Sequence, residues 1–161
     1  MEVVNLETSF ISLLVGNPSR ELIIAANQQT TRDWWELRRD QFVCAASSEV
    51  AREAGEGDPH EVLKRQVVLR QLTILPFTDE ADRIMRALIA TRALPPKAQA
   101  DAAHLAIAAA ATVDYLLTWN CRHLANAQIL ARLEQEAQLL GWKLPKVCTP
   151  AELMGDASYE T

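Results

Sequence analysis

Apolar residues gather in five short runs, and longer stretches with helical spacing separate them. The runs cover residues 2–6, 42–46, 73–76, 114–119 and 146–149. They are rich in Val, Ile, Leu and Tyr and mostly lack alternation of polar and apolar residues, which is typical of strands in a parallel sheet covered on both faces. Because these strands alternate with helices, we predict a three-layer α/β/α fold around a central, mostly parallel five-stranded sheet.

The helical stretches have recognisable ends. A long helix is predicted from residues 18–19 to about 39, and its apolar positions keep helical spacing: Ile23, Ala26, Trp34 and Leu37. Four more helices are predicted to begin near Asp58, Thr78, Lys97 and Asn126, and a short charged one covers 48–55. Adjacent helical residues differ in direction by about 100°. Trp34 is therefore expected in the core, and Trp35 is expected to be partly exposed at an interface.

Length and composition indicate one ordinary globular domain. We expect a single domain over residues 1–154 and a polar C-terminal tail over 155–161. No apolar run is long enough to span a bilayer, and the N-terminus lacks the basic region and cleavage site of a signal peptide. The three cysteines form no closely spaced metal-binding pair, and Cys44 and Cys148 are expected to be buried structural thiols. These features favour a cytoplasmic protein without membrane contact.

The net charge of −5 argues against binding of nucleic acid by bulk electrostatic attraction. It leaves room for a nuclease, because a bound metal covers part of the negative charge. A negative surface also suits a basic protein partner.

Candidate chemistry lies where strands end. Glu7 closes the first run, Asp101 opens an Ala-rich helix, and Asn120 follows the fourth run. The carboxyl ends of parallel strands form one edge, where ligands bind. Two carboxylates about 4 Å apart repel by roughly 4 kcal/mol at an effective dielectric near 20. A divalent cation that prefers oxygen ligands relieves this repulsion. The pattern therefore predicts a metal-dependent enzyme whose metal holds a phosphate.

Each of these residues also has an ordinary structural explanation. Asp101 suits the first turn of a helix, and Asn120 suits a turn. Glu53 lies on the short charged helix, where Glu49, one turn away, is an alternative second acid. The joint occurrence of the four residues on an alternating α/β chain is what favours a site.

Four stretches, in order, resemble the motifs of PIN-domain ribonucleases of the kind found as VapC-type toxins. They are ETSFIS at 7–12, SSEVARE at 47–53 followed by GDP at 57–59, DAAHLAIA at 101–108 and LLTWNCRHL at 116–124. The resemblance spans roughly residues 2–154. It implies a metal-dependent endoribonuclease, the toxin of a type II toxin–antitoxin pair, with RNA as substrate, an antitoxin as partner and a homodimeric assembly.

The resemblance also implies roles for individual residues. Glu7, Glu53 and Asp101 would hold one or two Mg²⁺ or Mn²⁺ ions, with Asn120 as a fourth catalytic residue. Supporting or substrate contacts would come from Thr8, Ser9, His104, Thr118 and Arg122. The metal would lower the pKa of a water and neutralise charge on the scissile phosphate. In-line attack would release a 5′-phosphate end.

The chain departs from the family pattern at two positions. The family's first acid is usually Asp, whereas this chain has Glu7; the fourth motif often carries Asp, whereas this chain has Asn120. These departures keep open an alternative, a catalytically weak or inactive PIN-fold module that binds RNA or protein. A third possibility, a nucleotide-binding α/β module, is disfavoured because no Gly-rich phosphate loop follows the first strand.

Overall fold

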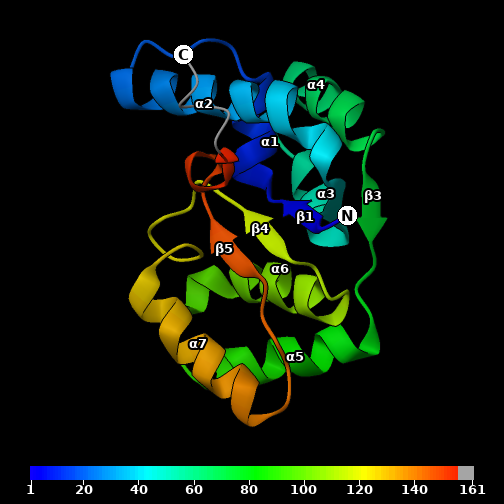
Figure 1. Ribbon diagram of the computed structural model, residues 1–161, viewed down its shortest axis with the longest axis vertical. Helices are drawn as coiled ribbons and strands as arrows, with labels where there is room; N and C mark the ends of the chain where they lie inside the picture. The colour runs from blue at the N-terminus through cyan, green and yellow to red at the C-terminus, as the bar shows by residue number, and fades with distance from the viewer. Residues whose placement is uncertain (156–161) are drawn as a thin grey trace.

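The computed structural model describes residues 1–155 and contains a five-stranded parallel sheet (Figure 1). Its strands are β1 (Val3–Leu6), β2 (Val43–Ser47), β3 (Thr73–Leu75), β4 (Tyr115–Leu117) and β5 (Lys146–Cys148). The spatial order is β3-β2-β1-β4-β5, and every neighbouring pair is parallel. The predicted sheet is confirmed, and it is parallel throughout. The strand order reverses between β1 and β4, so the carboxyl ends of these two strands flank the place where ligands bind in such sheets.

Within residues 1–155, seven α-helices surround the sheet. They are α1 (Thr8–Val15), α2 (Leu22–Arg38), α3 (Ser48–Ala54), α4 (Pro59–Leu69), α5 (Asp79–Ala90), α6 (Gln99–Ala110) and α7 (Ala127–Leu139). Helices α1, α2 and α4 pack together on one face, and α5, α6 and α7 cover the other (Figure 1). Helix α3 follows β2 directly and contacts both α1 and α6. The expected three-layer architecture is confirmed.

Helix starts follow local chemistry. The side chains of Asp58, Thr78 and Asn126 each accept a hydrogen bond from a backbone N–H in the first turn of the helix that follows. This bond satisfies a donor that the helix itself leaves free. Helix α7 ends two residues before Gly141, which takes φ 82°, a conformation that costs glycine little. The predicted starts of these three helices are therefore correct.

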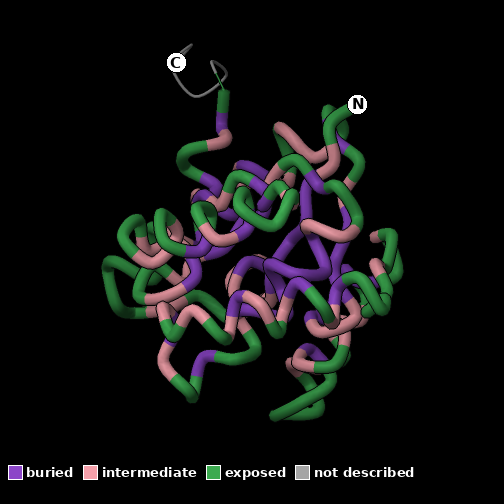
Figure 2. Tube along the Cα trace, turned by 90° about the horizontal axis from the view of Figure 1, so that it is seen from below, coloured by how far each residue is buried: buried purple, intermediate pink, exposed green. Residues whose placement is uncertain are grey.

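The sheet separates two hydrophobic clusters of different character. On the α1–α2–α4 side the core is aromatic: Phe10 meets Trp34 edge to face at 5.5 Å, and Trp34 stacks on Phe42 at 5.7 Å between ring centroids. On the other side the core is built from Leu, Ile and Ala of α5, α6 and α7. Six of the seven consecutive buried residues of α6, Ala102 to Ala108, are apolar, and four of them are alanines. Their small side chains let α6 lie close to the sheet and to α5. Figure 2 shows the buried strands at the centre of the molecule.

The apolar stripe predicted for the long helix is wrong except at Trp34. Trp34 is fully buried and Trp35 is partly buried beneath the guanidinium of Arg39, but Ile23 and Leu37 are 78% and 56% exposed. The buried residues of α2 are Gln28, Thr31 and Trp34, which follow one another at intervals of three along one face of the helix. The two polar residues are buried because each is hydrogen bonded. Gln28 holds the loop before α2 through Asn17 and Ser19, and Thr31 accepts a hydrogen bond from the indole of Trp119.

The cysteine expectations hold in part. Cys148 is buried, Cys44 is half-buried and Cys121 is exposed. Burial raises the pKa of the Cys44 and Cys148 thiols to about 11, so both are protonated and unreactive near neutral pH.

The predicted C-terminal tail falls, from residue 156 on, outside the described residues. Within residues 1–155, none of the helices has the length and apolar character needed to cross a membrane.

Candidate metal centre

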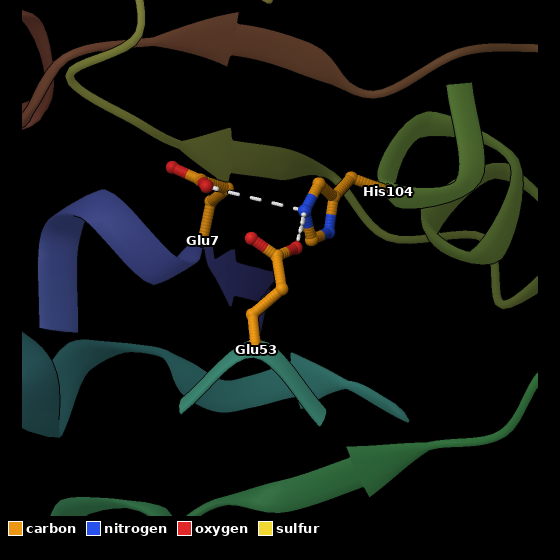
Figure 3. Close-up of side chains that lie close together, drawn as sticks. All are labelled: Glu7, Glu53 and His104. Atoms are coloured by element: carbon orange, nitrogen blue, oxygen red, sulfur yellow. Dashed lines mark ion pairs between the residues drawn. The ribbon is translucent and has the colours of Figure 1, made fainter. Parts of the chain in front are cut away.

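Acidic, imidazole and hydroxyl side chains from four separate segments of the chain converge at the carboxyl edge of the sheet. Glu7 directly follows β1, Glu53 lies on α3 after β2, His104 lies on α6, and Thr118 directly follows β4. Figure 3 shows Glu7 and Glu53 pointing toward the ring of His104. The fold thus gathers residues that are as far as 111 positions apart in sequence.

One carboxylate oxygen of Glu7 is held by three donors. Its Oε2 accepts hydrogen bonds from the backbone N–H of Ser9 (3.0 Å), the hydroxyl of Ser9 and the hydroxyl of Thr118 (2.8 Å). Glu7 also caps α1 in this way, and the positive end of the helix dipole favours its charge. The backbone N–H of Trp119 donates to Ser9 Oγ at 2.8 Å, which fixes the hydroxyl in turn. Since Oε2 is saturated, Oε1 is the oxygen left to face the cluster.

His104 forms a cluster with Glu7 and Glu53 and is the most deeply buried of the three, with 1% of its side chain exposed. Its Nδ1 lies 3.3 Å from the hydroxyl of Ser47, which also caps α3 by accepting from the N–H of Val50. Its Nε2 lies 2.6 Å from Glu53 Oε1 and 4.0 Å from Glu7 Oε1. Ser47 therefore fixes the ring so that Nε2 points at both carboxylates.

Three ligand atoms, one each from Glu7, Glu53 and His104, lie within 4.8 Å of one another. Such a spacing suits the binding of one divalent cation by two carboxylates and an imidazole. Glu53 Oε1 is a buried atom without an aligned hydrogen-bond donor among the described residues, despite its short distance from Nε2. A buried carboxylate oxygen needs a partner, and a cation supplies one. The residues present therefore fit a divalent metal.

Asp101 and Asn120 meet on the outer side of this cluster. The amide nitrogen of Asn120 lies 3.4 Å from Asp101 Oδ1, and the ring Nδ1 of His123 lies 3.7 Å from Asp101 Oδ2. Asn120 Oδ1 accepts from the backbone N–H of His123, and this bond shapes the loop after β4. These contacts are longer than the 2.6 Å approach of His104 to Glu53. The side chains of Asp101 (13% exposed) and His123 (21%) are more exposed than those of Glu7 (8%) and His104 (1%), although Glu53 is 25% exposed.

Burial and neighbouring charges shift two pKa values. Burial raises the pKa of Asp101, and the negative charges of Glu7 and Glu53 raise it further, although His104 opposes the change. For His104, burial lowers the pKa, but the carboxylates of Glu53 and Glu7 outweigh burial, and the pKa lies above its ordinary value. The neighbouring carboxylates thus favour the protonated form of His104 in the metal-free protein.

The remaining candidate residues have varied positions. Glu49 is not a member of the ligand group: it pairs with Arg52, which also binds Glu56. Arg122 is exposed in the loop after β4. Thr8 lies next to Glu7, and its hydroxyl is buried without a hydrogen-bond partner among residues 1–155. The structure thus brings Glu7, Glu53, Asp101 and Asn120 to one edge, together with Ser9, His104 and Thr118.

Sequence reasoning missed two residues at this edge. Ser47 ends β2 and orients His104, and its position just before a helix was the only clue to a cap. Asn5 lies two residues before Glu7, so its side chain is on the same face of the extended chain. Asn5 is fully buried, and neither polar atom of its amide has a hydrogen-bond partner within the described part of the chain. A polar residue inside an otherwise apolar strand was a signal that could have been read.

Comparisons with known proteins bear on the fold. No family model and no curated protein matches this sequence. Among solved structures, a chain of VapBC2 from Rickettsia felis, bound to a DNA fragment from their promoter, is similar with a TM-score of 0.56 and 17% sequence identity. The match covers 74% of this chain and 89% of that chain. At this identity the likeness concerns the fold alone, and it confirms the PIN-like fold that the sequence motifs implied.

Proposed function

We propose that this protein is a divalent-metal-dependent endoribonuclease that hydrolyses RNA phosphodiester bonds. The observation that carries the proposal is the convergence of Glu7, Glu53 and His104, with Asp101 beside them, at the point of the parallel sheet where strand order reverses. A cation site of this kind at an open sheet edge suits a substrate that is itself negatively charged. The sequence motifs support RNA as that substrate.

The metal, Mg²⁺ or Mn²⁺ in this proposal, would neutralise charge on the scissile phosphate and lower the pKa of an attacking water. Glu7 and Glu53 would hold it directly, and Asp101 would contribute the third carboxylate through water. Ser9 and Thr118 keep Glu7 in one orientation, so its Oε1 is positioned before substrate arrives. Asn120, through its amide, would orient a bound water. By analogy with the family, in-line attack would leave a 5′-phosphate end.

RNA binding would rely on few positive contacts, because the net charge is −5. Arg122 is exposed two residues after Asn120 and is the basic residue nearest in sequence to the outer side of the site. We assign it a phosphate contact. Thr8 would add a hydroxyl beside Glu7.

The biological setting of the proposal is a cytoplasmic type II toxin–antitoxin pair, with this chain as a homodimeric toxin and an antitoxin as its partner. The motif resemblance supports it, as does the likeness in fold to VapBC2. Trp35, partly buried on α2, is our candidate interface residue. Trp35→Ala should weaken partner binding without unfolding the protein, and unchanged partner binding would show that this surface is not the interface.

Cleavage of total cellular RNA by the purified protein with Mg²⁺ or Mn²⁺ tests the activity. We expect discrete cleavage that EDTA abolishes and that Glu53→Gln removes. Glu49→Gln is the matched control, because Glu49 lies one turn away on the same helix but pairs with Arg52. Cleavage that survives EDTA, or equal loss in both variants, would contradict the proposed site.

A second candidate function is a PIN-fold module that binds RNA or protein with little or no catalysis. Asn120 favours it, because a neutral amide stands where a fourth carboxylate is often found. Among the described residues, the acid that Asn120 contacts is Asp101, at 3.4 Å, which the proposed site already counts as one of its three carboxylates. RNA binding without cleavage under any divalent metal, by a folded and partner-free protein, would establish this alternative.

A further inference from the structure

We propose that His104 is a direct ligand of the metal, and that the site therefore prefers a divalent first-row transition ion over Mg²⁺ or Ca²⁺. The ligand set would be Glu7 Oε1, Glu53 Oε1 and His104 Nε2, two oxygens and one nitrogen. This inference deepens the proposed function, on which it rests for placing the cation at this site, but its test requires no RNA.

The first argument is position. Ligand atoms that share one small divalent ion lie about 3 Å apart or somewhat more, given metal–ligand distances near 2.1 Å. The Nε2 atom of His104 lies 2.6 Å from Glu53 Oε1 and 4.0 Å from Glu7 Oε1, values on either side of that separation. Glu53 has a quarter of its side chain exposed, so it is free to adjust. Asp101, one of the three acids expected from sequence to be metal ligands, is not a member of this group.

The second argument is support of the ligands. Histidines that bind metals have their other ring nitrogen held by a neighbour, which selects the ring orientation. Ser47 Oγ holds Nδ1 of His104 at 3.3 Å, and the hydroxyl is itself fixed at the N-terminus of α3. Glu7 is supported in the same manner by Ser9 and Thr118. Both ligands are therefore held in place from behind, with one atom each left to face the cluster.

The third argument is the unsatisfied polar atoms around the cluster. Glu53 Oε1 has no aligned donor, and both polar atoms of the fully buried Asn5 amide lack partners among the described residues. Asn5 lies on the same face of the chain as Glu7. Buried polar groups of this kind are satisfied in folded proteins by protein, water or ions. A hydrated cation bound by Glu7 and Glu53 satisfies the oxygen directly and brings water toward the amide.

Ligand chemistry then decides the metal class. Mg²⁺ and Ca²⁺ prefer all-oxygen sites, whereas imidazole favours transition ions. For a site with one nitrogen ligand, affinity is expected to rise from Mn²⁺ through Co²⁺ and to be high for Zn²⁺, with Mg²⁺ and Ca²⁺ weakest. His104 is thus the residue that sets metal preference, while the carboxylates supply charge.

Electron spin-echo spectroscopy of Mn²⁺ bound to the wild-type protein tests the ligand directly. We expect modulation from a directly bonded ¹⁴N nucleus of imidazole. A bound Mn²⁺ without nitrogen modulation, or the absence of Mn²⁺ binding, would overturn the proposal. Both results come from the wild-type protein, so neither depends on the folding of a variant. Nitrogen modulation in a protein that cuts no RNA would support this inference and refute the proposed function.

Calorimetric titration with MnCl₂, CoCl₂, ZnCl₂, MgCl₂ and CaCl₂ tests the preference. His104→Asp should bring the Mn²⁺ and Mg²⁺ affinities closer together, and His104→Gln should lower Mn²⁺ affinity by at least about tenfold. His60→Gln is the matched control, because it makes the same change at an exposed histidine of α4 outside the ligand group, and it should change Mn²⁺ affinity by less than about threefold. Circular dichroism establishes that each variant is folded. An unchanged Mn²⁺ to Mg²⁺ ratio in folded His104→Asp would overturn the proposed role of His104.

Discussion

Two histidine–carboxylate pairs lie at the same edge of the sheet and differ in how they are built. In the inner pair, His104 and Glu53 approach to 2.6 Å, and 1% of the histidine side chain and 25% of the glutamate side chain are exposed. In the outer pair, His123 and Asp101 are 3.7 Å apart, and 21% and 13% of their side chains are exposed. Ser47 supports the inner histidine from behind, whereas Asn120 contacts the outer pair from the loop after β4.

The difference separates two tasks. A cation binds more tightly to closely spaced ligands that are already oriented, because little free energy is spent on rearranging them when the cation binds. A group that meets substrate must be accessible and able to adjust. We therefore assign cation binding to the inner pair with Glu7, and contact with water and RNA to the outer pair with Asn120. Four predictions follow this division from the largest expected effect to the smallest.

Replacing Glu7 by Gln should abolish both metal binding and cleavage. The change removes one negative charge from the inner cluster while keeping the length of the side chain. We expect RNA cleavage to fall by roughly 100-fold or more, with Mn²⁺ affinity falling in parallel. Cleavage assays and calorimetry on the same preparation measure both. Normal Mn²⁺ affinity in the variant would mean that the cation binds elsewhere, and the assignment of cation binding to Glu7 and the inner pair would be wrong.

Replacing Asp101 by Asn should separate the two tasks. We expect cleavage to fall by about 10- to 100-fold, while Mn²⁺ affinity stays within about threefold of wild type, because Asp101 acts from the outer pair. His123→Gln is the companion variant and should behave in the same way to a smaller degree. If Asp101→Asn instead weakens Mn²⁺ binding as much as Glu7→Gln, the inner and outer pairs are one metal site.

Replacing Thr118 by Val tests the support behind Glu7. The substitution keeps the shape of the side chain but removes the hydroxyl that donates to Glu7 Oε2 at 2.8 Å. Because Ser9 still donates to the same oxygen, we expect a modest loss of about 1 kcal/mol in the free energy of unfolding, and about tenfold in Mn²⁺ affinity. Denaturant titration and calorimetry provide the two values. A loss of stability with unchanged Mn²⁺ affinity would mean that Thr118 only stabilises the fold.

The pH dependence of stability should distinguish the pairs in the metal-free protein. The pKa of His104 is raised in the folded state, so its contribution is fully present below pH 6.5 and is lost as pH rises through the folded-state pKa. The pKa of Asp101 is also raised in the folded state, so its contribution is present below the ordinary pKa of 3.8 and is lost as pH rises from there through the folded-state pKa. Unfolding in EDTA across pH 4 to 9 should therefore show a decline above about pH 6.5 that His104→Gln removes and Asp101→Asn retains.

The sequence could predict which residues reach this edge, because strand ends in a parallel sheet share one side. Glu7, Asp101 and Asn120 follow from that rule, and Glu53 follows from the short helix after β2. The sequence could not show which residue of α6 faces the other carboxylates. Asp101 and His104 are one turn apart on the same face, and only the folded chain shows that His104, and not Asp101, lies with Glu7 and Glu53.

The wrong prediction of an apolar buried stripe on α2 has a related cause. Periodicity weighs apolar residues alone, whereas Gln28 and Thr31 are buried because specific partners from distant segments satisfy them. Ile23, which shares the helix with them, is exposed near the start of α2. Hydrogen-bond partners far apart in sequence leave no periodic pattern in the sequence. Buried polar residues of this kind can therefore be recognised only in the folded chain.

The anchoring of Glu7 by Thr118 has a consequence for the order in which the protein is made. A chain of which only the first hundred residues have left the ribosome contains both glutamates but neither His104 nor Thr118. Its Glu7 has one anchoring residue fewer, and the imidazole between the glutamates does not yet exist. Translation must therefore pass Thr118 before the centre can assemble. For a protein proposed to cut RNA, this order keeps the centre incomplete while the segments that carry its two glutamates are already made.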